Sequence, residues 1–157
     1  MAGTLTPERT AERLCELSAD VRAAVLLDAA GVQAGGWGTS KAGSRELGEL
    51  ARELFEAVDR AHRDIPGGPP EQVEVQVERG TVYASRTPRW TLAAVARRSA
   101  LSSLMLMDLR AVLAELDGVR AIRRSVAVEE PGSSGPISDE AAAGESPVPE
   151  LGQDRLE

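Results

Sequence analysis

The stretch AGGWGTSKAGS, residues 34–44, combines the residue types that bind phosphate groups, namely glycines, hydroxyl side chains and Lys41. A phosphate-binding loop of the Walker type ends in Gly-Lys-Ser/Thr, because backbone amides and the lysine must meet at a helix N-terminus. Here Lys41 follows Ser40 and precedes Ala42, so the motif is incomplete. The spacing favours a glycine-rich connection between two elements over a phosphate cradle.

The other reactive side chains are isolated in the sequence. His62 is the only histidine and Cys15 the only cysteine, so the chain lacks the ligand clusters that bind metals and cannot form an internal disulfide. Glu74 and Glu78 recur at the spacing of one strand face, which is typical of a solvated surface. We therefore predict no catalytic, cofactor-binding or metal-binding residues and favour a protein that binds proteins over an enzyme.

The acidic charge of the chain is concentrated near its C-terminus. The formal net charge is −7, and residues 129–157 hold eight acidic residues and one arginine, which leaves 17 acidic and 17 basic residues in residues 1–128. A neutral body gives little support to nucleic-acid binding. No apolar run approaches the roughly 18 residues of a membrane span, and the first ten residues lack the order of a signal peptide. We expect a cytoplasmic protein.

Helical periodicity predicts three helices. The first begins near the N-terminus, the second covers residues 45–62 and is strongly amphipathic, and the third ends at Gly118. The expected N-caps are Thr6, Ser44 and Ser99. The residues expected to face the core or a dimer axis are Ala11, Leu14, Leu17, Leu54 and Phe55.

Five strands are expected between the helices. Residues 21–27 and 90–96 are nearly continuous in apolar residues, which suits central strands buried on both faces. The first of these is followed by a turn at residues 28–31 and a short strand at about 32–35. Residues 72–78 alternate strictly and suit an edge strand, followed by a strand after Gly80. In the edge strand, Val73, Val75 and Val77 are expected to point inward, and Glu74, Gln76 and Glu78 outward.

This order of elements predicts a three-layer α/β domain, in which one five-stranded antiparallel sheet carries helices on both faces. The domain is assigned to residues 1–128, with its core at about 10–117. From residue 129 onward, 12 of 29 residues are Gly, Pro or Ser and hydrophobic periodicity vanishes, so we predict a disordered acidic tail at residues 129–157. Residues 119–128 fit a helix, a strand or a coil.

Three segments carry a family resemblance: DVRAAVLLDAAGV, EQVEVQVERGTVYASRT and WTLAAVARRSALSSLMLMDLRAVLAEL. With the order of elements, they resemble the roadblock/dynein-light-chain family, in particular its bacterial members predicted to regulate Ras-like GTPases. The likeness covers roughly residues 10–117. It implies a profilin-like fold without catalytic residues, and homodimers in which edge strands pair into one sheet with the second helices side by side. It also implies an adaptor or activator of a small GTPase.

Applied to this chain, the resemblance predicts two surfaces. The dimer interface would comprise residues 73–78, with Gln76 near the two-fold axis, together with Leu54 and Phe55. The surface for a bacterial Ras-like GTPase would comprise Arg45, Glu49, Arg52, Glu56, Arg60 and Trp37. Two alternatives remain open: a small-ligand sensor, which would need a pocket with convergent polar groups, and a purely structural assembly subunit.

Overall fold

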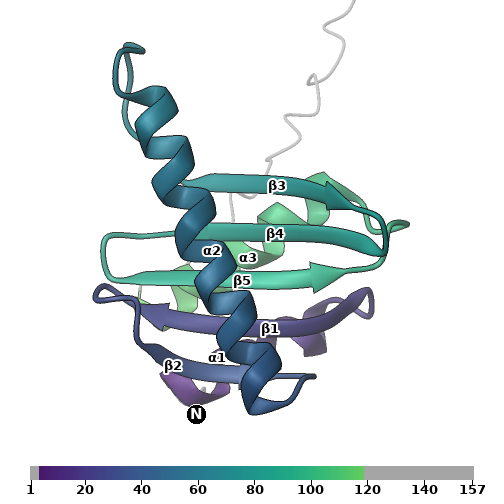
Figure 1. Ribbon diagram of the computed structural model, residues 1–157. Helices are drawn as coiled ribbons and strands as arrows, with labels where there is room; N and C mark the ends of the chain where they lie inside the picture. Colours follow the sequence, from purple (N-terminus) through teal and green to yellow (C-terminus); the bar gives the residue numbers. More distant parts are fainter. Residues whose placement is uncertain (1–3, 119–157) are drawn as a thin grey trace, which may run out of the picture. The chain divides into compact units, whose positions relative to one another are not determined.

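The computed structural model describes residues 4–118, so residues 119–128 and the predicted tail at 129–157 lie outside the described part of the chain. The elements follow the predicted order (Figure 1). They are α1 (Pro7–Leu17), β1 (Val21–Asp28), β2 (Gln33–Trp37), α2 (Lys41–His62), β3 (Gln72–Val77), β4 (Gly80–Arg86), β5 (Trp90–Ala96) and α3 (Ser102–Leu116).

The five strands form one antiparallel sheet in the order β2-β1-β5-β4-β3. The two continuous apolar segments, β1 and β5, lie side by side, with β5 in the middle of the sheet. Their residues Ala24, Val25, Ala93 and Ala94 are fully buried, because both faces of these strands are covered. The alternating segment β3 lies at an edge, so the predicted positions of the central and edge strands are confirmed.

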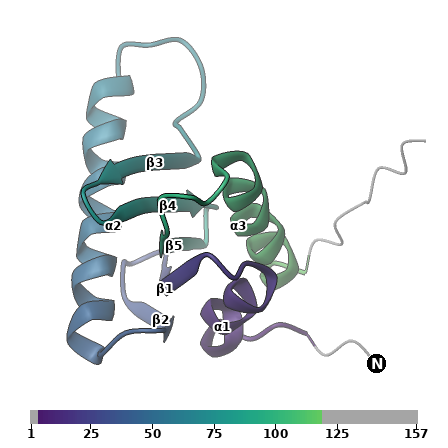
Figure 2. The ribbon, with the colours of Figure 1, turned by 90° about the vertical axis from the view of Figure 1, so that its right-hand side faces the viewer.

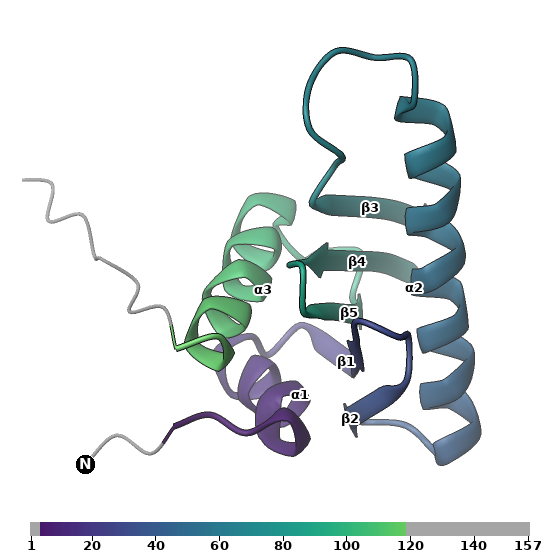
Figure 3. The same ribbon diagram turned by 90° about the vertical axis from the view of Figure 1, so that its left-hand side faces the viewer.

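Helices cover both faces of the sheet (Figures 2 and 3). On one face α1 and α3 pack against a core that includes Leu14, Leu26 and Leu109. On the other face α2 alone packs against a second core that includes Leu27 and Phe55. The predicted three-layer architecture is therefore confirmed. No helix among residues 4–118 combines the length and apolar character that crossing a membrane requires.

The glycine-rich stretch is shorter as a loop than the sequence suggested. Strand β2 continues to Trp37 and α2 begins at Lys41, where the Ser40 side chain caps the helix by accepting a hydrogen bond from the Gly43 amide at 3.2 Å. Ser44, the expected cap, is instead buried within the helix. A Cβ on Gly36 would lie 2.9 Å from the Ser44 hydroxyl, so this glycine permits the close approach of β2 and α2.

The ends of α1 and α3 differ in part from the expectations. Thr6 occupies the predicted N-cap position of α1, but its side chain makes no capping hydrogen bond; its carbonyl instead accepts from the Thr10 hydroxyl at 2.9 Å. Leu17, which was expected to face the core, is 44% exposed at the end of α1. The helix α3 begins after Leu101, since Ser99 falls within a turn closed by the hydrogen bond from the Ala100 amide to the Arg97 carbonyl.

Candidate interaction surface

Strand β3 presents an open edge of the sheet. It pairs with β4 from Gln72 opposite Ser85 to Val77 opposite Gly80, and no described strand pairs with its other side. The Arg86 amide donates a hydrogen bond to the Glu71 carbonyl at 2.8 Å. In an antiparallel ladder, successive residues direct their backbone groups alternately to the two neighbouring strands. Odd-numbered residues of β3 therefore bond β4, and the N–H and C=O groups of Gln72, Glu74 and Gln76 point to the open side.

The side chains of β3 differ partly from the expected alternation. Val73 and Val75 are half-buried on the α2 face, as expected, but Val77 is 43% exposed because the end of the strand extends beyond the cover of α2. Glu74 and Gln76 are exposed. Glu78 lies in the turn after the strand, which ends at Val77.

The side chain of Glu74 is held by α3 across the other face of the sheet. Its Oε1 accepts a hydrogen bond of 2.8 Å from the Ser102 hydroxyl, which lies 3.2 Å from the Tyr83 hydroxyl. Nearby, Gln72 Nε2 donates to the Leu106 carbonyl at 2.8 Å. These contacts fix the orientation of two edge-strand side chains. The sequence analysis missed Ser102 and Tyr83, because contacts between residues so far apart in the chain leave no periodic signal.

The helix α2 carries an apolar flank beside its buried face. Phe55 is 5% exposed and belongs to the core of the α2 side, and Leu54 is half-buried against the same core, which Val73 also borders. Leu50 is 39% exposed. We call the set on this side of the helix the apolar flank; its members are Leu50, Leu54, Ala57 and Ala61.

The surface of α2 opposite the apolar flank is charged. Arg45 Nε lies 3.1 Å from Glu49 Oε1, and Arg52 Nε lies 3.8 Å from Glu56 Oε1, each pair one helical turn apart. All four side chains and Arg60 are exposed. The structure thus brings the five predicted partner residues on α2 into one surface, which we call the charged flank: Arg45, Glu49, Arg52, Glu56 and Arg60.

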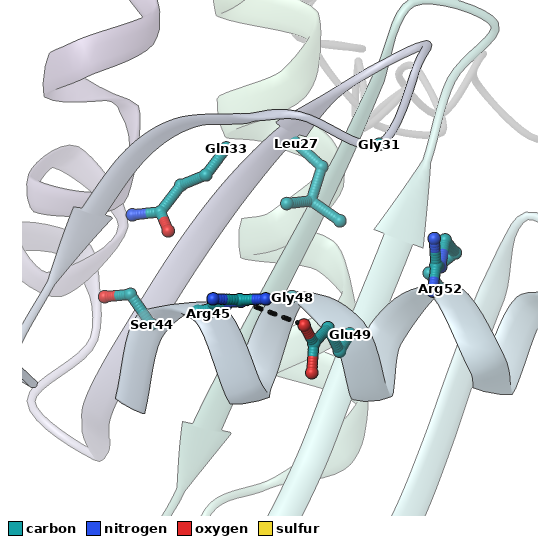
Figure 4. A pocket seen from close by; sticks show the side chains of 8 residues that line it. All are labelled: Leu27, Gly31, Gln33, Ser44, Arg45, Gly48, Glu49 and Arg52. Carbon is teal, nitrogen blue, oxygen red and sulfur yellow. Dashed lines mark hydrogen bonds and ion pairs between the residues drawn. The ribbon is translucent and has the colours of Figure 1, made fainter. Parts of the chain in front are cut away.

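A groove of about 200 Å³ runs between the charged flank and the turn that joins β1 to β2 (Figure 4). Gly31 in this turn has a φ of +78°, and a Cβ there would lie 3.6 Å from the Arg52 side chain. The groove contains three of the predicted partner residues. Its lining residues are Leu27, Gly31, Gln33, Ser44, Arg45, Gly48, Glu49 and Arg52.

The C-terminal end of α2 is tied to the sheet by Arg86 of β4. The Arg86 guanidinium lies 4.4 Å from the centre of the Phe55 ring, forms a bidentate ion pair with Asp59, and donates from Nε to the Pro70 carbonyl at 2.9 Å. The hydrogen bonds from Arg86 hold the pKa of the Asp59 carboxyl below its usual value. This cluster sets the position at which α2 crosses the edge strand, and sequence reasoning did not find it.

Trp37 does not join the charged flank. It is 39% exposed at the end of β2 and lies opposite Ala24 in the β1–β2 ladder. Ala24 packs in the core beneath α1 and α3. Because residues directly opposite each other point to the same face of a sheet, Trp37 lies on the face away from α2.

The isolated reactive residues do not gather into a site. Among residues 4–118, no three His, Cys, Asp or Glu side chains lie close enough to hold a metal ion. Cys15 is half-buried on α1, where burial raises the pKa of its thiol to about 11, so the nucleophilic thiolate is scarce near neutral pH. His62 lies at the end of α2 beside Asp59.

Comparison with known proteins assigns the family. The model of the Roadblock/LC7 domain matches residues 10–96, more than half of the chain, from α1 to the end of β5. The chain belongs to the Roadblock/LC7 domain family. None of the curated proteins matches this Roadblock/LC7 sequence.

Solved structures agree with the Roadblock/LC7 assignment. A Roadblock/LC7 domain from Streptomyces avermitilis is 20% identical with a TM-score of 0.65, and the match covers 71% of this chain and 94% of that one. MglB from Myxococcus xanthus is 15% identical with a TM-score of 0.62, covering 72% and 86%. A profilin from Schizosaccharomyces pombe is 10% identical with a TM-score of 0.50, covering 72% and 98%. The predicted profilin-like fold is confirmed.

Proposed function

We propose that this Roadblock/LC7 protein is a non-catalytic homodimer that binds a small Ras-like GTPase of a bacterium and modulates its activity or location. Family membership supports a regulatory role, and the GTPase partner is the one that the resemblance of the sequence implies. The likeness to MglB concerns the fold.

The observation that carries the dimer is the combination of an open strand with an overhanging helix. Backbone groups of Gln72, Glu74 and Gln76 point outward from β3, and an edge of this kind invites pairing. Figure 1 shows that the last turns of α2 extend past β3, which is the last strand of the described sheet on that side. A second copy paired along β3 would place its own sheet there and cover Leu50 and Leu54.

The charged flank supports the second part of the proposal. In the dimer the two apolar flanks face each other, whereas the charged flanks stay exposed on the same side of the joined sheet. Both side chains of each ion pair on the charged flank are more than half exposed. Such surface pairs contribute only about 0–1 kcal/mol to stability, so these side chains can form ion pairs with a bound protein instead at a small cost in free energy. Five charged side chains on a rigid helix offer specific contacts to a protein surface.

The test is a binding assay with the Ras-like GTPases encoded in the same genome, each loaded with GDP or a non-hydrolysable GTP analogue. We expect one GTPase to bind the dimer, and the variant Arg45→Glu/Arg52→Glu to lose this binding while it keeps its dimer mass. Arg9→Glu, an exposed site on α1, serves as the control and should bind as the wild type does. A dimer that binds none of these GTPases would contradict the proposal and favour a structural assembly subunit.

A further inference from the structure

The sequence of β3 specifies how a second copy pairs with it. We infer that two β3 strands pair antiparallel with Val75 on the two-fold axis, so that the strand recognises its own sequence and rejects other registers. This inference rests on the proposed dimer and names the contacts within it. It replaces the register with Gln76 on the axis that the sequence alone suggested.

The first argument is the charge pattern of the open edge. Gln72, Glu74 and Gln76 alternate between amide and carboxylate along one face of β3, and Glu78 continues this alternation in the turn that follows the strand. In a symmetric antiparallel pair, one residue lies on the two-fold axis and faces its own copy. Every other residue faces the partner residue that lies the same number of positions from the axis in the opposite direction along the sequence. With Gln76 on the axis, Glu74 faces Glu78 of the partner subunit; with Glu74 on the axis, it faces its own copy. Like charges directly opposite are unfavourable.

A valine on the axis removes this repulsion. With Val75 there, Glu74 faces Gln76 of the partner subunit and Gln72 faces Glu78 of the partner subunit, so every carboxylate meets a carboxamide. Val73 faces Val77 of the partner subunit. This pairing covers the Val77 side chain, which is 43% exposed in the single chain. The Ser102 hydroxyl donates to Oε1 of Glu74, and this bond does not use Oε2.

The second argument is the spacing of the α2 helices, which selects Val75 among the valines. Leu54 and Val73 both pack against the core that contains Phe55, and Phe55 lies under Arg86, whose amide bonds Glu71, so α2 crosses β3 near its beginning. Packed helices lie about 8–10 Å apart, so each must cross about 4–5 Å from the axis. At about 3.3 Å per residue, this distance corresponds to about 1.2–1.5 residues beyond Val73, which is between Glu74 and Val75. Because the charge pattern excludes Glu74 from the axis, Val75 is the position that remains.

The other two valines fail this criterion. An axis at Val73 would bring the two helices onto almost the same line. An axis at Val77 would separate them by about 13 Å more than an axis at Val75, because moving the axis by two residues shifts both helices by about 6.6 Å each. The apolar flanks would then have no partner. The charge pattern excludes Glu74 and Gln76 from the axis, and the helix spacing excludes Val73 and Val77, so the two arguments together leave Val75.

Cysteine cross-linking tests the register directly in a Cys15→Ser background. Val75 bonds β4, so its symmetric pair on the open side is non-hydrogen-bonded, with Cα atoms about 4.5 Å apart, within the range of a disulfide. We expect Val75→Cys to form a disulfide-linked dimer under mild oxidation. Val73→Cys and Val77→Cys are matched controls that should not cross-link alone, since each lies about 13 Å from its own copy, but should cross-link when mixed.

A charge swap gives a second test at exposed positions that leave the core intact. Gln76→Glu places residue 76 of each copy opposite Glu74 of the other copy, which creates two carboxylate-to-carboxylate pairs. The dimer dissociation constant should rise by roughly threefold to thirtyfold, as expected for two unfavourable cross-strand pairs. The double variant Glu74→Gln/Gln76→Glu restores carboxamide-to-carboxylate pairs and should recover dimerisation. With Glu74 on the axis, Gln76→Glu would change little; with Gln76 on the axis, the double variant would stay weak.

The outcomes separate the register from the dimer. A wild type that remains monomeric in light scattering overturns the proposed dimer. A dimeric wild type in which Val73→Cys or Val77→Cys cross-links alone, or in which the double variant fails to recover, overturns only the register. If Val75→Cys unfolds, which its melting curve shows, the charge swap decides. Cross-linking at Val75 alone, with recovery by the double variant, supports the inference.

Discussion

Arg86 and Asp59 form a bidentate ion pair between β4 and the last turns of α2, with Nη1 to Oδ2 at 2.8 Å and Nη2 to Oδ1 at 2.5 Å. The same guanidinium covers the Phe55 ring and binds the Pro70 carbonyl ahead of β3. A single side chain thus links the helix and the edge strand on which the proposed dimer depends.

Replacing Arg86 should destabilise the domain more than replacing other surface arginines. Arg86→Leu removes three hydrogen bonds and a ring contact, and we expect the free energy of unfolding to fall by about 1–2 kcal/mol, since the pair is partly screened by solvent. Urea unfolding measures this change. Arg45→Leu, which breaks an exposed pair within α2, is the control and should change stability by less than about 0.5 kcal/mol.

The ion pair also predicts how stability depends on pH. The hydrogen bonds from Arg86 lower the pKa of Asp59 in the folded state, so the ionised carboxylate contributes stability above the unfolded pKa of about 3.9. That contribution is lost as the pH falls from about 4 through the folded pKa. Asp59→Asn should therefore reduce the loss of stability on acidification. Urea unfolding of the wild type and of Asp59→Asn, from pH 6 down to the lowest pH at which both remain folded, checks this. Identical slopes of the free energy of unfolding against pH would contradict it.

Leu54 is the position at which the fold and the proposed dimer meet. It is half-buried in the single chain, and Leu54→Asp would place a carboxylate between the paired apolar flanks. We expect this variant to unfold or to give unstable monomers, as measured by melting and light scattering. Leu17→Asp, at an exposed leucine at the end of α1, should keep both the melting temperature and the mass. A Leu54→Asp protein that keeps both would remove α2 from the interface.

Deleting residues 129–157 should leave the domain folded, because residues 4–118 already form a five-stranded sheet with a hydrophobic core on each face. We expect the melting temperature to change by less than about 2 °C. The net charge would rise from −7 to 0, since residues 1–128 carry equal numbers of acidic and basic residues, and solubility should fall. Loss of cooperative unfolding in this variant would show that the domain extends beyond residue 128.

Much of the fold was predictable because periodicity reports burial. The continuous apolar segments β1 and β5 and the alternating β3 indicated their places in the sheet. The amphipathic period of residues 45–62 indicated that one face of α2 is buried, and Leu47, Ala51 and Phe55 lie on that face. The boundaries at residues 34–44 were not predictable in this way. Both Ser40 and Ser44 suit an N-cap, and the choice depends on the packing of Ser44 against Gly36.

The candidate surface was predictable only where it follows one element. The charged flank lies along a single helix, so its members share a surface as expected from their spacing. Trp37 lies on β2 and on the face of the sheet away from α2, because it is paired with Ala24, whose side chain points to that face. The contacts of Glu74 with Ser102 and of Asp59 with Arg86 join elements that are distant in the sequence, so no local sequence pattern predicts them.

Comparing the mass of the wild type with that of Gln76→Pro decides whether the protein dimerises through β3. The backbone N–H of Gln76 points to the open side of β3, and proline removes this donor without touching a bond to β4. Gln76→Ala keeps the N–H and is the control. In light scattering we expect a dimer for the wild type and Gln76→Ala, and a folded monomer for Gln76→Pro that no longer binds a GTPase. A monomeric wild type, or a dimeric Gln76→Pro protein, would contradict a dimer built on β3.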